Sequence, residues 1–326
     1  MFRCIFCLTD KPAEDEHREH VFPEAIGGTL AIDRVCVCCN STLGSVADAP
    51  LTNHLHILLR RSQLNLSGTS GKVPDGVAAL LGKKRVLAHD PSQEVLLVKN
   101  PETGDLELRL KRTQLPDGTV RVDDRDRDAL KKTIKRRYKR RKIEAPSDAE
   151  LDRLIDQHSI INPMTPAESA VIVHHAVNIS HSQRCIFKIA YELSIRWLGE
   201  VYIDDPAAKF LREVALEKRR PEDANIKYKI LWGSDLNVLA FWNNKKNCHV
   251  AYSQKSAGHV VIILKIFDVF SAWIMVSETP NLYANEDRFI HIHPVSGALR
   301  ESTFSDEIHR MVSEAVAERA SQIKLL

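Results

Sequence analysis

Cys4-Ile-Phe-Cys7 and Cys36-Val-Cys-Cys39 are two CxxC pairs that lie about thirty residues apart. Two cysteines at this spacing form a knuckle that presents both sulfurs to one ion, and two knuckles complete a tetrahedral zinc site. A lone CxxC is also found in redox proteins, but two pairs in one short stretch favour structural zinc. Four thiolates fill such a site, so this zinc would stabilise the fold without taking part in catalysis. Cys38 lies inside the second pair and is expected to point away from the ion.

The rest of the composition is that of a globular protein. The chain has 326 residues, of which 44% are hydrophobic and 27% charged, and its length predicts more than one domain. Five of the seven cysteines lie in the first 39 residues, and no basic segment followed by a long apolar stretch opens the chain. We therefore expect a cytoplasmic protein without disulfides. No apolar run approaches the roughly eighteen residues of a membrane span, so no membrane partner is expected.

A second motif lies between the two knuckles. It reads Glu19-His20-Val-Phe-Pro-Glu-Ala-Ile-Gly-Gly28, and Asn40 follows the last cysteine directly. With the two CxxC pairs, Leu43-Gly44 and Asp48, this order resembles the HNH, or ββα-metal, endonucleases, in particular those with a four-cysteine zinc. The resemblance covers roughly residues 4 to 51. It implies a small ββα-metal module that hydrolyses phosphodiester bonds.

The resemblance also implies a role for each residue of this motif. In the family, the acidic residue and the amide hold one divalent ion and the histidine activates water. Carried over, Glu19 and Asn40 are ligands of a catalytic Mg²⁺ or Mn²⁺, His20 is the general base, and Asp48 is a further candidate ligand. The chemistry agrees, because hard cations prefer oxygen ligands and an imidazole can accept a proton near pH 7. An alternative role for Asn40 is to cap the following helix.

The sequence around the Glu-His pair departs in two ways from a regular strand and from the family pattern. Adjacent residues on a regular strand point to opposite sides, so we expect a bulge or twist next to Glu19 and His20. Many members of the family have Asp in place of Glu19, and an Asn near the second knuckle that braces the loop holding the base. Here that region reads Asp33-Arg34. Asp33 or Arg34 must therefore brace the loop in another way. His17 is expected on an exposed loop.

A basic segment suggests how the protein holds its substrate. The net charge is only +3, but residues 131–142 read KKTIKRRYKRRK, nine basic residues in twelve. Such a run suits a polyanion, because each neutralised phosphate releases a counterion. The candidate nucleic-acid contacts are Lys131, Lys132, Lys135, Arg136, Arg137, Lys139, Arg140, Arg141 and Lys142. The alternative is a solvated helix face beside a linker.

The pattern along the chain predicts an α+β protein with a small N-terminal ββα-metal zinc module and a larger mixed α+β body. We expect three regions: the module in residues 1–55, a β-rich region ending in the basic segment in residues 56–145, and an α+β domain in residues 146–326. Apolar spacing predicts helices over 182–198 and 206–218. Strands are predicted over 228–232, 238–242, 249–252, 260–267, 272–277 and 289–293, and a final helix over 305–323.

Three functions compete at this point. The first is a DNA endonuclease that acts in defence against invading DNA, with RNA left open as a substrate. The second is a non-catalytic zinc module that binds nucleic acid or protein. The intact order of acid, base and amide argues against it, because binding needs none of them. The third is an HNH effector that is controlled by a partner protein or ligand bound at the C-terminal region.

Overall fold

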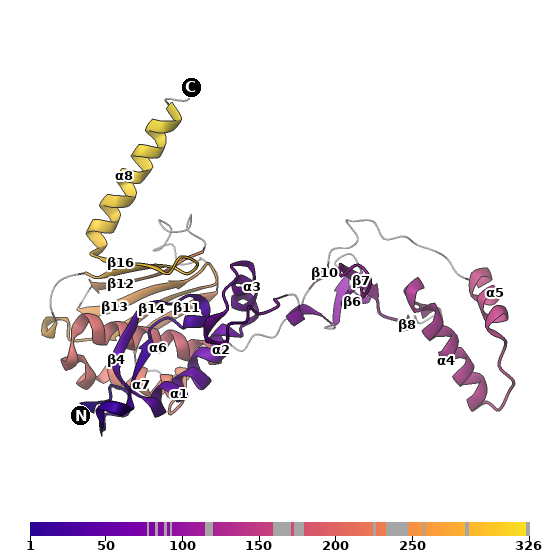
Figure 1. Ribbon diagram of the computed structural model, residues 1–326, viewed down its shortest axis with the longest axis horizontal. Coiled ribbons are helices and arrows are strands. Elements are labelled where there is room, and N and C mark those ends of the chain that lie inside the picture. Colours follow the sequence, from indigo (N-terminus) through magenta and orange to yellow (C-terminus); the bar gives the residue numbers. More distant parts are fainter. Residues whose placement is uncertain are drawn as a thin grey trace. The chain divides into compact units, whose positions relative to one another are not determined.

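The protein is described by a computed structural model in which the chain forms two compact units (Figure 1). Unit 1 consists of Met1–Gly76 and Val177–Leu326, and unit 2 consists of Val77–Ala176. The structure describes residues 1–76, 78–81, 84–87, 90–91, 93–114, 120–158, 171–172, 179–223, 226–232, 247–256, 258–283 and 287–323. The α+β class predicted from the sequence is confirmed, since both units combine helices with antiparallel sheets.

This division differs from the three predicted regions. The N-terminal residues do not form a separate body, because buried residues such as Phe22 and Leu43 share one hydrophobic core with Phe187 and Ile262 from the C-terminal part. A segment of about fifty residues buries little apolar surface by itself, so a core shared with other elements adds to the stability that bound zinc can give it. The basic segment lies inside unit 2, which continues beyond it to residue 176.

The N-terminal part has the predicted ββα order. A hairpin of two strands is followed directly by a helix that packs against both of them, and shorter helical segments then lead away. Its elements are β1 (Phe2–Arg3), β2 (Asp10–Lys11), β3 (Glu16–His20), β4 (Ala31–Cys36), α1 (Val37–Leu43), a π-helical turn (Gly44–Asp48), α2 (Ala49–Thr52) and α3 (Leu55–Gln63).

The C-terminal part of unit 1 is built on a six-stranded antiparallel sheet in the order β11-β14-β13-β12-β15-β16. Its strands are β11 (Tyr228–Trp232), β12 (His249–Ser256), β13 (His259–Ile266), β14 (Phe270–Ser277), β15 (Phe289–His293) and β16 (Ala298–Ser302). Five of the six predicted strands correspond to β11–β15, the predicted strand 238–242 lies outside the described residues, and β16 was not predicted. The central strand β13 is buried along nearly its whole length, as its apolar, β-branched sequence indicates.

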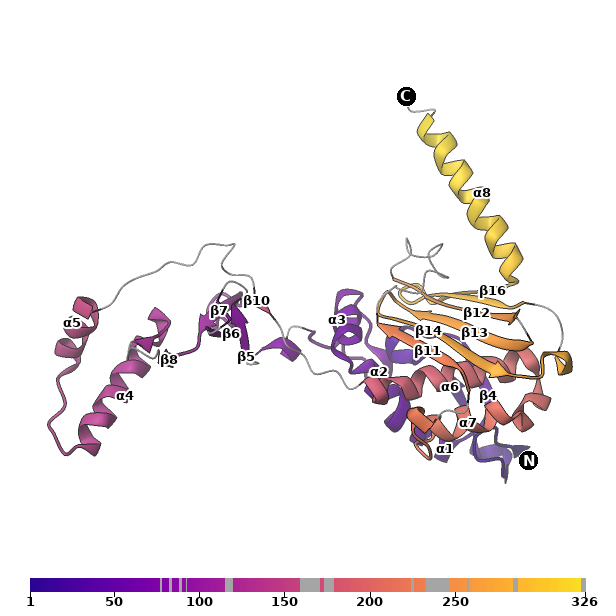
Figure 2. The same cartoon turned by 180° about the vertical axis from the view of Figure 1, so that it is seen from behind.

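Two helices cover one face of this sheet, as Figures 1 and 2 show. They are α6 (Ile179–Leu198) and α7 (Pro206–Ala215), and a third helix, α8 (Phe304–Ile323), closes the chain. Asp205 caps α7 by accepting a 2.8 Å hydrogen bond from the backbone N–H of Ala207, and Pro206 takes the first helical position. The helix ends earlier than predicted because Glu217, at φ 59°, has left-handed backbone geometry.

Helix α6 is the element that joins the two parts of unit 1. It contacts α7 and β14 on one side, and the π-helical turn and α2 on the other. Residues 185–194 are consequently buried all around the helix. Polar side chains within residues 185–194 therefore face other protein groups instead of water.

Unit 2 contains a four-stranded sheet in the order β10-β5-β6-β7, a two-stranded sheet of β8 and β9, and two helices. The elements are β5 (Lys84–Leu87), β6 (Glu94–Lys99), β7 (Leu106–Leu110), β8 (Thr113–Gln114), β9 (Val120–Arg121), α4 (Arg127–Arg140), α5 (Asp148–His158) and β10 (Val171–Ile172). Across the described residues of both units, every helix is too short or too polar to cross a membrane.

Candidate metal centres and active site

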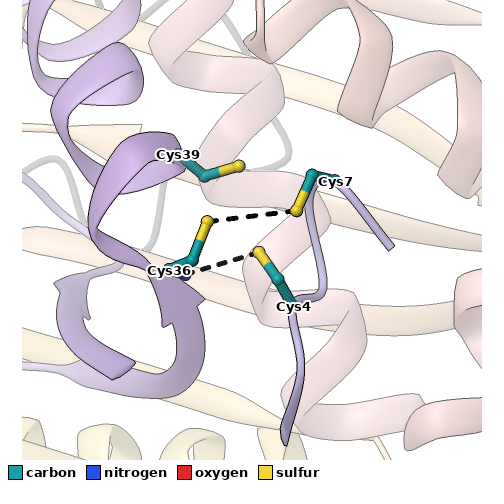
Figure 3. A group of neighbouring side chains, drawn as sticks. All are labelled: Cys4, Cys7, Cys36 and Cys39. Carbon is teal, nitrogen blue, oxygen red and sulfur yellow. Dashed lines mark hydrogen bonds between the residues drawn. The ribbon is translucent and has the colours of Figure 1, made fainter. Parts of the chain in front are cut away.

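The four cysteines of the two CxxC pairs come together as predicted (Figure 3). Their sulfur atoms all lie within 4.8 Å of one another, and Cys4, Cys36 and Cys39 are buried. Within the described ranges, this is the only group of three or more His, Cys, Asp or Glu side chains gathered this closely. Cys38 is exposed and lies outside the group, also as predicted. The donor set fits structural zinc, because four sulfurs at this separation match a closed tetrahedral site.

Local backbone geometry shapes the first knuckle. Leu8 has φ 60°, and its N–H donates to the carbonyl of Cys4 at 2.9 Å, so the chain turns back after Cys7. The N–H of Cys36 points at Cys4 Sγ from 3.4 Å. Backbone N–H groups aimed at sulfur stabilise a thiolate, which is the form that binds the metal.

The irregularity predicted near the Glu-His pair is present in the strand that faces it. The register of β3 and β4 shifts between the pairs His17–Val35 and Glu19–Ile32, so β4 carries one extra residue. Arg34 in this bulge has φ 66°, and its N–H donates to Glu16 Oε1 at 2.9 Å. Its carbonyl accepts a 3.0 Å bond from Ile5 in the first zinc knuckle. Arg34 thus ties the strand before the Glu-His pair to the cysteine cluster.

His20 and Asn40 lie on neighbouring elements of this module. The Asn40 side-chain amide donates to the carbonyl of Arg18 on β3 at 3.3 Å, which places α1 against the strand that carries His20. The His20 ring is half-buried and makes no hydrogen bond to the described part of the chain. Burial lowers the pKa of His20 from its ordinary value, so the ring is neutral and able to accept a proton at neutral pH.

Glu19 turns inward instead of toward solvent. Its side chain is 5% exposed, and Oε1 lies 2.5 Å from the ammonium nitrogen of Lys188 on α6. Burial raises the pKa of Glu19, while the charge of Lys188 acts in the opposite direction. Asp48 lies beside the same ammonium, with its two carboxylate oxygens at 3.0 and 3.1 Å. The sulfur of Cys185 also lies 3.3 Å from Asp48 Oδ1.

Lys188 is the site residue that sequence reasoning missed. It is fully buried, and although burial opposes its charge, the carboxylates of Asp48, Glu192 and Glu19 hold the pKa of Lys188 well above its usual value. A signal existed in the sequence, because Lys188 and Glu192 stand four residues apart within the otherwise apolar stretch 185–193. Such a pair in a buried helix indicates a partner that carries charge.

The basic segment forms most of α4, and its nine cationic side chains fall into two groups. Lys131 pairs with Asp128 and Asp152, and Lys135 pairs with Asp148, the first residue of α5. The other seven are exposed. These residues, the outer face of α4 and its end, are Lys132, Arg136, Arg137, Lys139, Arg140, Arg141 and Lys142.

Comparison with known proteins places the N-terminal module in a family. Residues 4–56 match the family model described as HNH endonuclease. This range contains both zinc knuckles, the Glu-His pair, Asn40 and Asp48, so the N-terminal module of the chain belongs to the HNH endonuclease family. No curated protein and no solved structure matches the chain.

Proposed function

We propose that this protein is a metal-dependent endonuclease that hydrolyses phosphodiester bonds in DNA. The observation that carries the proposal is the placement of His20 within the HNH module. Its half-buried ring has no hydrogen-bond partner in the described part of the chain and lies on the strand that Asn40 contacts. A neutral imidazole that is held on a braced strand but free at the ring has the properties of a general base.

The oxygen donors near His20 fit a Mg²⁺ or Mn²⁺ ion held by few protein ligands. The second carboxylate oxygen of Glu19 and the side-chain oxygen of Asn40 are the proposed ligands. Mg²⁺ usually keeps several waters and is bound by one or two protein oxygens together with substrate phosphates, so a larger ligand group is not required. When bound, such an ion neutralises charge on the phosphate and assists departure of the 3′ oxygen.

The protein's own residues then have separate tasks. His20 takes a proton from the water that attacks phosphorus, while Glu19 and Asn40 would hold the divalent ion that neutralises the phosphate charge. Both oxygens of Asp48 already face Lys188, so we assign Asp48 to positioning and not to direct contact with the ion. The exposed side of α4 supplies the sequence-independent contacts to the DNA backbone. The role in defence expected from the sequence stays a prediction.

The decisive experiment compares two histidines of the same strand. Purified full-length wild type, His20→Ala and His17→Ala are incubated with plasmid DNA and Mg²⁺ or Mn²⁺. We expect His20→Ala to lose about 10²- to 10⁴-fold in cleavage rate, because general-base catalysis typically contributes that much. His17 is exposed, so His17→Ala controls for a change in charge or strand structure and should cleave like wild type.

Binding of DNA, measured with EDTA present, should be the same for all three proteins. Wild-type cleavage by His20→Ala at saturating metal would remove His20 from the mechanism. Binding without any metal-dependent cleavage by wild type would favour the non-catalytic zinc module.

A further inference from the structure

Lys188 reaches into the HNH module from outside the family match. It lies at the middle of α6, more than one hundred residues beyond residue 56, yet its ammonium is surrounded by groups of that module. Besides the contact to Glu19, it donates to the carbonyl oxygen of His20 at 2.8 Å and to both oxygens of Asp48. An ammonium has three hydrogens, and three acceptor groups surround this one.

These contacts connect the parts of the module that must keep a fixed geometry. Glu19 and His20 end β3, and Asp48 closes the π-helical turn that leads into α2. The bond to the His20 carbonyl fixes the backbone of the proposed base, while the ion pair fixes the carboxylate beside it. One buried cation therefore sets the position of two residues with different tasks in the reaction.

The charge balance shows that the cluster needs its lysine. The positive charge of Lys188 lies among three carboxyl groups, those of Glu19, Asp48 and Glu192. Glu192 is 4.0 Å away, on the next turn of α6. Both carboxyl oxygens of Glu192 are buried without a hydrogen-bond partner in the described part of the chain. Removal of one partner from a buried charge cluster leaves the others uncompensated, so their side chains would have to move apart or take up protons.

We propose that Lys188 is a positioning residue of the nuclease site, which fixes Glu19 and the backbone of His20 from the C-terminal part of unit 1. The inference rests on the proposed function. It means that residues 4–56 are not a complete catalytic unit, because α6 supplies the group that aligns them. A misplacement of about 1 Å between base and substrate can cost about 100-fold in rate.

The test uses full-length Lys188→Met, which keeps most of the length of the unbranched side chain and removes its charge. Tyr191→Phe is the matched control. Tyr191 lies one turn further along α6, and its hydroxyl donates to the carbonyl of Ile5, so the variant removes a bond between the same helix and module but away from the Glu-His pair. Four quantities are compared with wild type: the melting temperature, the DNA affinity in EDTA, the cleavage rate at saturating Mn²⁺, and the NMR signal of the His20 ring.

We expect Lys188→Met to cleave about 100-fold more slowly at saturating Mn²⁺, to bind DNA normally and to shift or broaden the His20 ring signal. Tyr191→Phe should keep the wild-type rate and the wild-type His20 signal. If Lys188→Met does not fold, Lys188→Gln replaces it, because glutamine retains N–H donors for the His20 carbonyl and Asp48. Its cleavage rate should also fall and its His20 signal should also shift, but less than in Lys188→Met.

Two results would overturn the inference. The first is an unchanged His20 signal with an unchanged rate in a folded variant. The second is tighter Mn²⁺ binding with an unchanged rate, because Lys188 would then occupy the place of the ion. The His20 signal also separates this inference from the proposed function. If wild type cleaves no DNA but the signal still changes in Lys188→Met, the positioning role stands and the nuclease assignment fails.

Discussion

At the scale of single residues, Glu19 and Asn40 are proposed to bind the same ion but have different surroundings. Glu19 is buried against an ammonium, whereas Asn40 is half-buried and contacts only a backbone carbonyl through its amide nitrogen. A change at Glu19 would therefore disturb the Lys188 cluster as well as any ion. Asn40 offers the cleaner test of metal binding.

We predict that Asn40→Ala raises the Mg²⁺ concentration needed for half-maximal cleavage by about tenfold or more, with a recoverable rate at high metal. The physical reason is that Asn40 holds the ion and does not move a proton, so added metal can compensate for its loss. The shift is measured by titrating cleavage with Mg²⁺. Asn53→Ala, at an exposed position of the same module, should leave the titration unchanged. Asn40 lies inside α1, whose N-cap is Cys36, so the structure does not support the helix-capping role considered from the sequence. A normal titration for Asn40→Ala would leave Asn40 only its hydrogen bond to the carbonyl of Arg18.

At the scale of elements, the two knuckles and the bulge of β4 form one brace. The bulge residue Arg34 contacts the first knuckle through its carbonyl, and the second knuckle begins α1. Zinc bound by the four cysteines would therefore fix the first knuckle to the end of β4, the strand that pairs with the His20 strand, and to the helix that carries Asn40. Folding of the module and metal binding should be coupled.

We predict one tightly bound zinc per chain after EDTA washing, measured by elemental analysis. Cys39→Ser should lose the zinc and lower the melting temperature, because it removes a ligand and leaves three thiolates. Cys38→Ser, at the exposed neighbouring position, should keep both. A folded module without zinc after the wash would contradict the four-cysteine assignment.

Helix α4 divides its charges between two tasks. Lys131 and Lys135 neutralise acidic residues of the α5 region, so the charge available to a polyanion lies on the other face. The sequence shows a single basic run, and only the helical geometry separates the paired lysines from the exposed ones.

We predict that alanine at Lys132, Arg136, Lys139 and Arg140 weakens DNA binding for all sequences alike and lowers the slope of log affinity against log salt. Each lost phosphate contact on duplex DNA reduces that slope by about 0.9. Lys131→Ala with Lys135→Ala is the control, since these lysines are already paired, and its salt slope should change little. Equal slopes for wild type and the four-residue variant would make α4 a solvated face.

At the scale of the whole of unit 1, the HNH module is fixed to the sheet as well as to α6. His249 on β12 is fully buried, accepts the N–H of Phe267 at Nδ1 and donates from Nε2 to the carbonyl of Ile26 at 2.8 Å. Gly27 follows with φ 82°, and a Cβ there would lie 2.5 Å from Pro294 Cβ. Close backbone approach at this point therefore requires glycine.

We predict that this contact makes the stability depend on pH. Burial lowers the pKa of His249 to about 4, below the value near 6.5 of an unfolded histidine. The unfolded chain takes up the proton first as the pH falls, so the stabilisation from neutral His249 is complete above about pH 6.5 and is lost toward pH 4. The expected loss between pH 7 and pH 5 is about 2 kcal/mol.

The measurement is the free energy of unfolding by denaturant at both pH values. His249→Gln keeps an N–H donor for Ile26 but does not titrate, so its stability should fall less than that of wild type over the same interval. His17→Ala, a change at an exposed histidine, should follow wild type. Parallel losses for wild type and His249→Gln would show that His249 does not titrate as expected.

The sequence by itself determined the zinc knuckles, the family of the N-terminal module and most of the strands in the C-terminal sheet. Each of these depends on local information. Cysteine spacing fixes which sulfurs can share an ion, and short apolar, β-branched runs favour strands wherever they later pair. The Glu-His pair and Asn40 could be predicted as site residues because the motif is contiguous with the knuckles, and their roles stay predictions.

Only the tertiary structure decided what Glu19 faces, which lysines of α4 are free, and where one unit ends. Lys188 meets Glu19 across almost 170 residues of chain, and no local pattern encodes that contact. The module of about fifty residues buries little apolar surface by itself, and its core is completed by residues of α6 and the sheet. That shared core places the buried cation of α6 beside the Glu-His pair, and so the C-terminal part shapes the site that the N-terminal motif defines.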